Sequence, residues 1–314
     1  MKASDKNSPG RGLAPVVLFI YNRPVHTRRT LEALSRNVFA NETVLYVFAD
    51  GPKENASQEA LNLINQAREV IKEKQWCKEV VLELRERNMN LEDNIIDGIT
   101  RVINRHGKAI MLDDDLLTSP YFLKYCNEGL TIYEDSKQVF SINAQMFDID
   151  FETEPEVFLS PIATNSTGWA TWADRWNLFE SNPPYINEID ADPFLKARFN
   201  VGVQNKMMML KHMNTWDIRW YYTVFVRNGL GVFPTRSLIE NIGFDGSGTH
   251  KGWENISQKL YLEPIPVTRL TTINLKHYSR MLNFVKIEPV STRQKIKNLL
   301  KRILPFKLSY DQKN

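Results

Sequence analysis

Three consecutive acids, Asp113, Asp114 and Asp115, are the residues of this sequence whose types and spacing best suit a catalytic or ligand-binding site. They directly follow the apolar run 109–112, which is typical of a buried β-strand. In open α/β sheets, ligands bind at the carboxyl ends of the strands, where these acids would lie. The carboxylates repel one another and have no obvious cation near them, so Mn²⁺ or Mg²⁺, which prefer carboxylate oxygens, would offset the repulsion. Such an ion keeps positions for substrate phosphates, so the triplet predicts a metal–diphosphate site; the alternative is a solvated acidic turn.

The elements that position these acids follow an alternating pattern. Apolar residues at helical spacing separate four apolar runs typical of buried strands, at 16–20, 44–48, 80–84 and 109–112. This repeated β-α order predicts an α/β fold with a mostly parallel sheet flanked by helices. The strand ends then bring Asn22, Arg23 and Asp50 to the same edge as the triple acid. Neither a Gly-x-Gly-x-x-Gly fingerprint nor a P-loop is present, which disfavours dinucleotide binding and a P-loop NTPase.

The second half of the chain adds aromatic residues and a glycine-rich loop. Trp169, Trp172 and Trp176 are close in sequence, and their rings could pack in the core or form a platform for a sugar. We expect at least two of them in the core. The polar segment 241–250 contains three glycines and ends at His250, so it could close over a ligand or simply form surface turns.

In their order and spacing these motifs resemble the nucleotide-sugar glycosyltransferases of the GT-A fold, and among them bacterial relatives of N-acetylglucosaminyltransferase I. The resemblance runs from about residue 14 to about residue 250. The segments that carry it are 21–24, 48–52, 108–122, 168–172, 216–217 and 243–250.

The resemblance implies roles for individual residues. Asp114 would contact the donor ribose and Asp115 would bind the metal that bridges the diphosphate. Asp113 stands where the family often has Glu, and its shorter side chain leaves its contact open.

Further roles come from the same resemblance. Asn22 and Arg23 would border the nucleotide, Asp50 would lie near the uracil, and His250 could touch the diphosphate or the metal. Asp217 matches the general base of the family; the alternatives are a structural pair with Arg219 or a helix cap. At least one of Trp169, Trp172 and Trp176 would wall the donor or acceptor sugar.

The predicted function is that of a metal-dependent glycosyltransferase that moves a sugar from a nucleotide diphosphate sugar, UDP by resemblance, to a hydroxyl of a glycan or glycolipid. A single base, Asp217, predicts inversion at the anomeric carbon. A sugar-nucleotide pyrophosphorylase is one alternative, although that class carries a Gly-rich, Lys/Arg-containing loop where this chain has Tyr-Asn-Arg-Pro. A non-catalytic carbohydrate-binding protein that relies on the tryptophans is another.

Composition sets the wider expectations. The 314 residues are 42% hydrophobic and 25% charged, as in soluble globular proteins. We expect a disordered leader at 1–13, a catalytic domain at 14–285 with nucleotide-sugar (14–120) and acceptor (121–285) halves, and a tail at 286–314. Two cysteines without metal-ligand spacing and no secretion signal favour a cytoplasmic protein.

The tail carries the basic character of the chain. Its segment 293–308 holds six Lys and Arg residues and no acid, whereas the whole chain has a net charge of only +3. Its apolar residues follow a helical period, so it predicts a basic amphipathic helix that either binds an anionic membrane surface or docks on the catalytic domain. A peripheral enzyme of bacterial surface polysaccharide or lipopolysaccharide synthesis, on the inner face of the membrane, would fit this pattern. A nucleic-acid partner is not expected.

Overall fold

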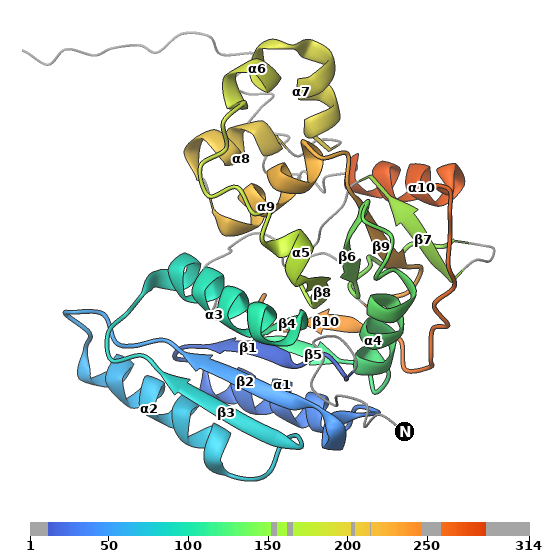
Figure 1. Ribbon diagram of the computed structural model, residues 1–314. Coiled ribbons are helices and arrows are strands. Elements are labelled where there is room, and N and C mark those ends of the chain that lie inside the picture. Colours follow the sequence, from blue (N-terminus) through green and yellow to red (C-terminus); the bar gives the residue numbers. More distant parts are fainter. Residues whose placement is uncertain are drawn as a thin grey trace, which may run out of the picture.

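A mixed eight-stranded sheet forms the centre of the protein (Figure 1). A computed structural model describes residues 12–151, 156–161, 166–201, 205–213, 215–245 and 259–286. The strand order is β3-β2-β1-β4-β8-β6-β9-β7. The strands are β1 (Val16–Ile20), β2 (Val44–Ala49), β3 (Glu79–Leu84), β4 (Lys108–Asp113), β6 (Val139–Asn143), β7 (Val157–Ser160), β8 (Trp169–Trp172) and β9 (Leu230–Pro234).

The first four strands of the chain run parallel and are connected by helices. The helices are α1 (Pro24–Ser35), α2 (Gln58–Lys72) and α3 (Asn90–His106), with a short 3-10 turn, η1 (Ala40–Glu42), before β2. Local sequence sets their ends: Pro24 opens α1, Ser57 caps α2 by accepting a hydrogen bond from the amide of Ala60, and Gly107 ends α3 with a positive φ of 80°. Because β1 pairs directly with β4 in parallel, their carboxyl ends lie side by side.

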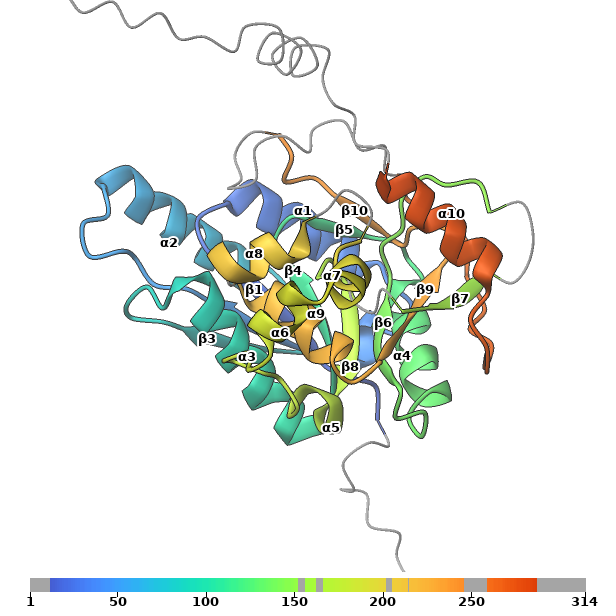
Figure 2. The same cartoon turned by 90° about the horizontal axis from the view of Figure 1, so that it is seen from above.

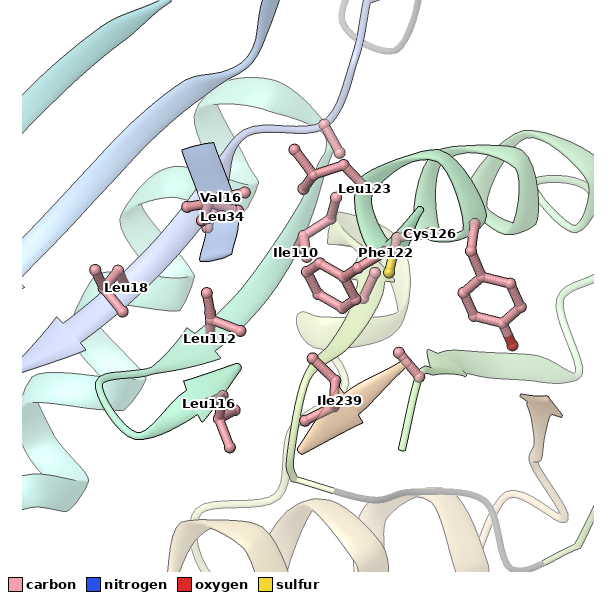
Figure 3. Close-up of a cluster of buried hydrophobic side chains, with 14 of the residues drawn as sticks. Val16, Leu18, Leu34, Ile110, Leu112, Leu116, Phe122, Leu123, Cys126 and Ile239 are labelled. Atoms are coloured by element: carbon pink, nitrogen blue, oxygen red, sulfur yellow. The ribbon is translucent and has the colours of Figure 1, made fainter. Parts of the chain in front are cut away.

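Apolar residues cover both faces of this half-sheet. On one face, Val16 and Leu18 of β1 pack with Leu34 of α1 and with α2 (Figure 3). On the other face, Val17 and Phe19 pack against α3. Burial on both faces explains why the runs of β1, β2 and β4 are continuously apolar, whereas the edge strand β3 is only half-buried and carries Glu83.

Strand β8 joins the two halves of the chain in one sheet. It runs antiparallel to β4 on one side and to β6 on the other. Beyond β6, β9 is parallel and β7 is antiparallel. The elements beside these strands are α4 (Phe122–Ile132), α5 (Ala173–Trp176), α9 (Trp216–Phe225) and α10 (Leu275–Lys286).

Two smaller units complete the fold. Three short helices stand together beside α9 (Figure 2), and they share an apolar cluster with it. They are α6 (Ile186–Ala191), α7 (Pro193–Phe199) and α8 (Lys206–His212). A separate two-stranded antiparallel sheet pairs β5 (Leu116–Thr118), directly after the triple acid, with β10 (Ile239–Asn241).

The α/β fold with a mainly parallel sheet and flanking helices is therefore confirmed, and so are the four apolar strands. Residues 1–11 of the expected leader, His250 and the 293–308 helix lie outside the described residues. Across the described part of the chain, none of the helices has the length and apolar character that would let it cross a bilayer.

Candidate active site

The triple acid lies where β4 ends. Asp113 is the last residue of the strand, and Asp114 and Asp115 form the turn into β5. Two hydrogen bonds fix the backbone of this turn: Thr30 Oγ1 of α1 donates to the carbonyl of Asp114 at 2.8 Å, and the amide of Ile242, after β10, donates to the carbonyl of Asp115 at 2.9 Å. The acids are therefore held in place from two sides.

Arg23, predicted at the same edge of the sheet as the triple acid, contacts two of its carboxylates directly. Its Nη2 donates to Asp114 Oδ1 at 2.5 Å and to Asp115 Oδ2 at 2.9 Å. No cation is obvious beside the acids in the sequence, and the fold supplies one from the turn after β1. Arg23 follows β1 and the acids follow β4, and these two strands are neighbours with Phe19 opposite Asp113. Arg23 and Asp114 are 91 residues apart in the sequence, and the parallel pairing of β1 with β4 brings them into contact.

The electrostatics of the cluster follow from burial and mutual repulsion. Burial, and then the charges of Asp115 and Asp114, raise the pKa of Asp113 to about 8. Burial also raises the pKa of Asp114 to about 6, although Arg23 acts in the opposite direction. Burial acts to lower the pKa of Arg23, but the two neighbouring carboxylates outweigh it and leave that pKa raised. The cluster therefore favours added positive charge.

Gly243 closes one side of the Arg23–Asp115 pair. A Cβ atom at this position would lie 2.1 Å from Asp115 Oδ2 and 3.1 Å from Arg23 Nη1, so no larger residue fits without displacing the carboxylate. The Gly243 amide donates to Asn241 Oδ1 at 2.8 Å. Two residues later, Asp245 Oδ2 lies 3.1 Å from His26 Nε2 of α1. The described start of the glycine-rich loop is thus part of the site.

Asp217 lies in the first turn of α9, and tertiary structure brings its charge close to the acids. It contributes to the raised pKa of Asp113, after burial and the other acids. Thr215 Oγ1 donates to Asp217 Oδ1 at 2.5 Å, and Thr215 is the N-cap residue of the helix. Arg219 pairs with Glu92 of α3 instead of Asp217. Neither structural alternative considered for Asp217 is therefore observed.

Two residues near Asp217, Glu92 and Lys206, belong to no motif that the sequence analysis singled out. Glu92 Oε1 accepts from the amide of Trp216 at 3.0 Å, which joins the start of α3 to the start of α9. Lys206 Nζ lies 4.5 Å from the centroid of the Tyr221 ring. Burial lowers the pKa of Lys206, and the charge of Asp217 opposes that shift.

Asp50 is held within its own loop. Its Oδ1 accepts from the amides of Gly51 and Met89, both at 2.8 Å, and its Oδ2 accepts from Asn88 Nδ2 at 2.9 Å. Both oxygens are thus engaged in joining the loop after β2 to the start of α3. A contact with a base stays a prediction, and it would require the carboxylate to share these bonds.

The tryptophans lie in the core. Trp169, Trp172 and Trp176 are 1%, 3% and 2% exposed. Trp169 packs against Trp216, with ring centroids 6.1 Å apart and an interplanar angle of 17°, and against Trp220 at 5.8 Å. Side chains with this exposure cannot contact a sugar in this conformation, which corrects the expectation that at least one of the three rings walls one. Trp169 and Trp176 bury large aromatic area beside α3 and α9, whereas Trp172 packs on the other face of the sheet and donates to the carbonyl of Leu130 in α4.

The remaining predicted site residues are less defined. Asn22 is half-buried in the turn between β1 and α1, next to Arg23. His250 lies outside the described residues. Arg23, the triple acid and Asp217 are therefore the predicted residues that the fold brings together.

The chemistry of the acids fits a divalent ion that arrives with a nucleotide. In the described ranges, no set of three or more His, Cys, Asp and Glu side chains is arranged to hold a metal. Asp115 can still supply a ligand, because none of the described residues donates a hydrogen bond to its Oδ1. Mn²⁺ and Mg²⁺ accept one or two protein carboxylates and take their other ligands from phosphates and water.

Comparison with known proteins gives only distant similarities. No protein-family model matches the sequence, and no curated protein matches it. A structure of TarS 1–349 from S. aureus is 9% identical with a TM-score of 0.37, over 72% of this chain and 59% of TarS 1–349. An apo UDP-glucose pyrophosphorylase is 12% identical with a TM-score of 0.31, over 70% of this chain and 90% of that chain. The bifunctional glycosyltransferase WbbM is 12% identical with a TM-score of 0.30, over 68% of this chain and 38% of that chain. Similarities this low do not define an activity for this chain.

Proposed function

We propose that this chain is a metal-dependent glycosyltransferase that uses a nucleotide diphosphate sugar, specifically a UDP-sugar. The observation that supports it is the gathering of Arg23, the triple acid and Asp217 at the carboxyl end of β4. Three distant parts of the sequence thus supply a cation, metal-binding oxygens and a separate carboxylate to one place. A relationship to N-acetylglucosaminyltransferase I, with transfer of a hexosyl or N-acetylhexosaminyl group, is part of this proposal.

Each group would have a distinct task. A divalent ion held by Asp115 would supply Lewis-acid stabilisation to the leaving diphosphate. Asp217 accepts the proton of the acceptor hydroxyl, whose oxygen forms the new bond to the anomeric carbon. The bond from that carbon to the phosphate oxygen breaks, and its electron pair leaves with the nucleoside diphosphate. One displacement with one base inverts the anomeric configuration.

The two rival functions are disfavoured by specific features. A carbohydrate-binding protein that relies on the tryptophans would need exposed rings, and the three rings of the cluster are at most 3% exposed. A pyrophosphorylase would need a Gly-rich basic loop after the first strand. Here α1 begins at Pro24, so only residues 21–23 separate it from β1.

Calorimetric binding of UDP, with and without Mn²⁺, tests the proposal. We expect the wild type to bind UDP in a metal-dependent way, Asp115→Ala to lose this binding, and Asp135→Ala to retain it. Asp135 is an exposed acid after α4 and serves as the matched control. Absence of UDP binding by the wild type would refute the UDP–metal site.

The class of reaction needs a second assay. Incubation with a panel of UDP-sugars and Mn²⁺ should release UDP, slowly with water and faster with a suitable glycan or glycolipid. Formation of UTP from a UDP-sugar and pyrophosphate would instead establish the pyrophosphorylase.

A role in bacterial surface polysaccharide synthesis, and attachment of the 293–308 segment to the inner face of the membrane, extend the proposal. Six basic residues near an anionic surface would each contribute about 1 kcal/mol. Co-sedimentation of the full chain with phosphatidylserine vesicles, against neutral vesicles, is the test. Equal recovery in both supernatants would remove the membrane part of the proposal.

A further inference from the structure

Arg23 already occupies the place of a cation between two carboxylates. A single nitrogen, Nη2, donates to both Asp114 Oδ1 and Asp115 Oδ2. The side chains of the three residues are 22%, 6% and 15% exposed, respectively, so water screens this contact only partly. A guanidinium in this position neutralises one of the two negative charges.

The contact is enclosed and its backbone is fixed. A Cβ at Gly243 would lie 2.1 Å from Asp115 Oδ2 and 3.1 Å from Arg23 Nη1, so the Gly243 backbone packs closely against the contact. The amide of Ile242 holds the carbonyl of Asp115. The backbone of Arg23 is held as well, because its carbonyl accepts from the amide and the hydroxyl of Thr27, both at 2.9 Å. With these backbones held, the contact opens by side-chain rotation, and Arg23 has the longest and most flexible of the three side chains.

We propose that Arg23 and a divalent cation compete for the Asp114–Asp115 carboxylates, and that the Arg23 guanidinium moves to the donor diphosphate when the cation binds. The inference rests on the proposed function. Every charged group keeps an oppositely charged partner in this exchange. The carboxylates bind the metal, and the released guanidinium binds two phosphate oxygens, whose spacing suits its planar fork. Metal alone therefore binds weakly, and metal and nucleotide bind together.

Binding of Mn²⁺ alone, followed by electron paramagnetic resonance on the full chain, tests the competition. Arg23→Gln should bind Mn²⁺ about tenfold more tightly than the wild type, the factor expected when one charge-assisted hydrogen bond no longer has to be broken. Arg28→Gln is the control: it removes the same charge from α1, where Arg28 pairs with the exposed Glu73. Its Mn²⁺ affinity should equal that of the wild type.

The UDP affinity measured with Mn²⁺ should change in the opposite direction. Arg23→Gln should bind UDP more weakly than the wild type, because the diphosphate loses its guanidinium, whereas mere structural damage would weaken both Mn²⁺ and UDP binding. Tighter Mn²⁺ binding in Arg23→Gln without UDP binding by any variant would support the competition and refute the proposed function.

Two results would overturn the inference while leaving the function intact. One is UDP binding by the wild type together with an Arg23→Gln affinity for Mn²⁺ equal to or weaker than that of the wild type. If Arg23→Gln does not fold, Arg23→Lys takes its place, because it keeps the charge without the planar fork. Its Mn²⁺ affinity should exceed that of the wild type, by a smaller factor than expected for Arg23→Gln. The second overturning result is an Arg23→Lys protein whose Mn²⁺ affinity equals that of the wild type.

Discussion

Replacing Asp50 by alanine separates a structural role of this carboxylate from a role in nucleotide binding. Asp50 is 6% exposed, and its two oxygens accept from the amides of Gly51 and Met89 and from the Asn88 side chain. Truncation leaves these three donors without their acceptor; Gly51 is buried, and Asn88 and Met89 are half-buried. The bonds join the segment after β2 to the start of α3, so their loss should destabilise the part of the sheet formed by β1, β2 and β3.

The magnitude follows from the number and type of these bonds. A hydrogen bond to a charged group contributes about 1.5–3 kcal/mol, and a buried donor left unsatisfied costs about 1–3 kcal/mol. The three bonds share one carboxylate and are not additive, so we expect Asp50→Ala to lower the free energy of unfolding by about 3–4 kcal/mol. Asp50→Asn keeps an oxygen for the two backbone amides and should cost about 1–2 kcal/mol.

Equilibrium unfolding in urea measures both changes. Asp135→Ala, at an exposed position, is the control and should change the free energy of unfolding by less than about 0.5 kcal/mol. The reasoning fails if Asp50→Ala costs less than about 1 kcal/mol. In that case the carboxylate is not needed for the loop, and a contact with the base becomes the better explanation of its position.

Three further predictions concern the site and the core. Gly243→Ala should lower the free energy of unfolding by about 1–3 kcal/mol, because its Cβ forces the Asp115 carboxylate away from Arg23. Gly12→Ala, with nothing within 4 Å of the added carbon, is the matched control, and equal urea midpoints would contradict the close approach. Asp217→Asn should keep Mn²⁺-dependent UDP binding but lower kcat about 10²–10⁴-fold in the transfer assay, and wild-type turnover would exclude it as the base. Burial raises the pKa of the Cys77 thiol to about 12 and that of Cys126 further still, so at pH 8 neither should react with a thiol reagent until the protein is unfolded. Rapid labelling of the folded protein would show that these thiols are accessible.

The pattern of the sequence was sufficient for the first half of the fold. Strands buried on both faces must be continuously apolar, and helices that cover them must be apolar at helical spacing, so β1, β2, β4 and their helices follow from residue order alone. The position of the triple acid at a strand end follows in the same way. In an α/β sheet, ligands bind at the carboxyl ends of the strands. The residue at which an apolar run stops therefore predicts where ligand-binding side chains lie.

The partners of these residues were decided by tertiary structure. Strand pairing between β1 and β4 puts Arg23 between Asp114 and Asp115, and pairing between β5 and β10 brings Gly243 against them. A sequence shows neither which strands are neighbours nor at what register.

Burial was decided in the same way. The indole ring of Trp169 could by its type form a platform for a sugar. Its place on β8, between α3 and α9, buries it in the hydrophobic core instead. Asp50 follows a strand as a ligand-binding acid would, yet the start of α3 engages its oxygens first. Residue type limits what a side chain can do, whereas the contacts it makes depend on segments far away in the chain, which only the folded arrangement brings together.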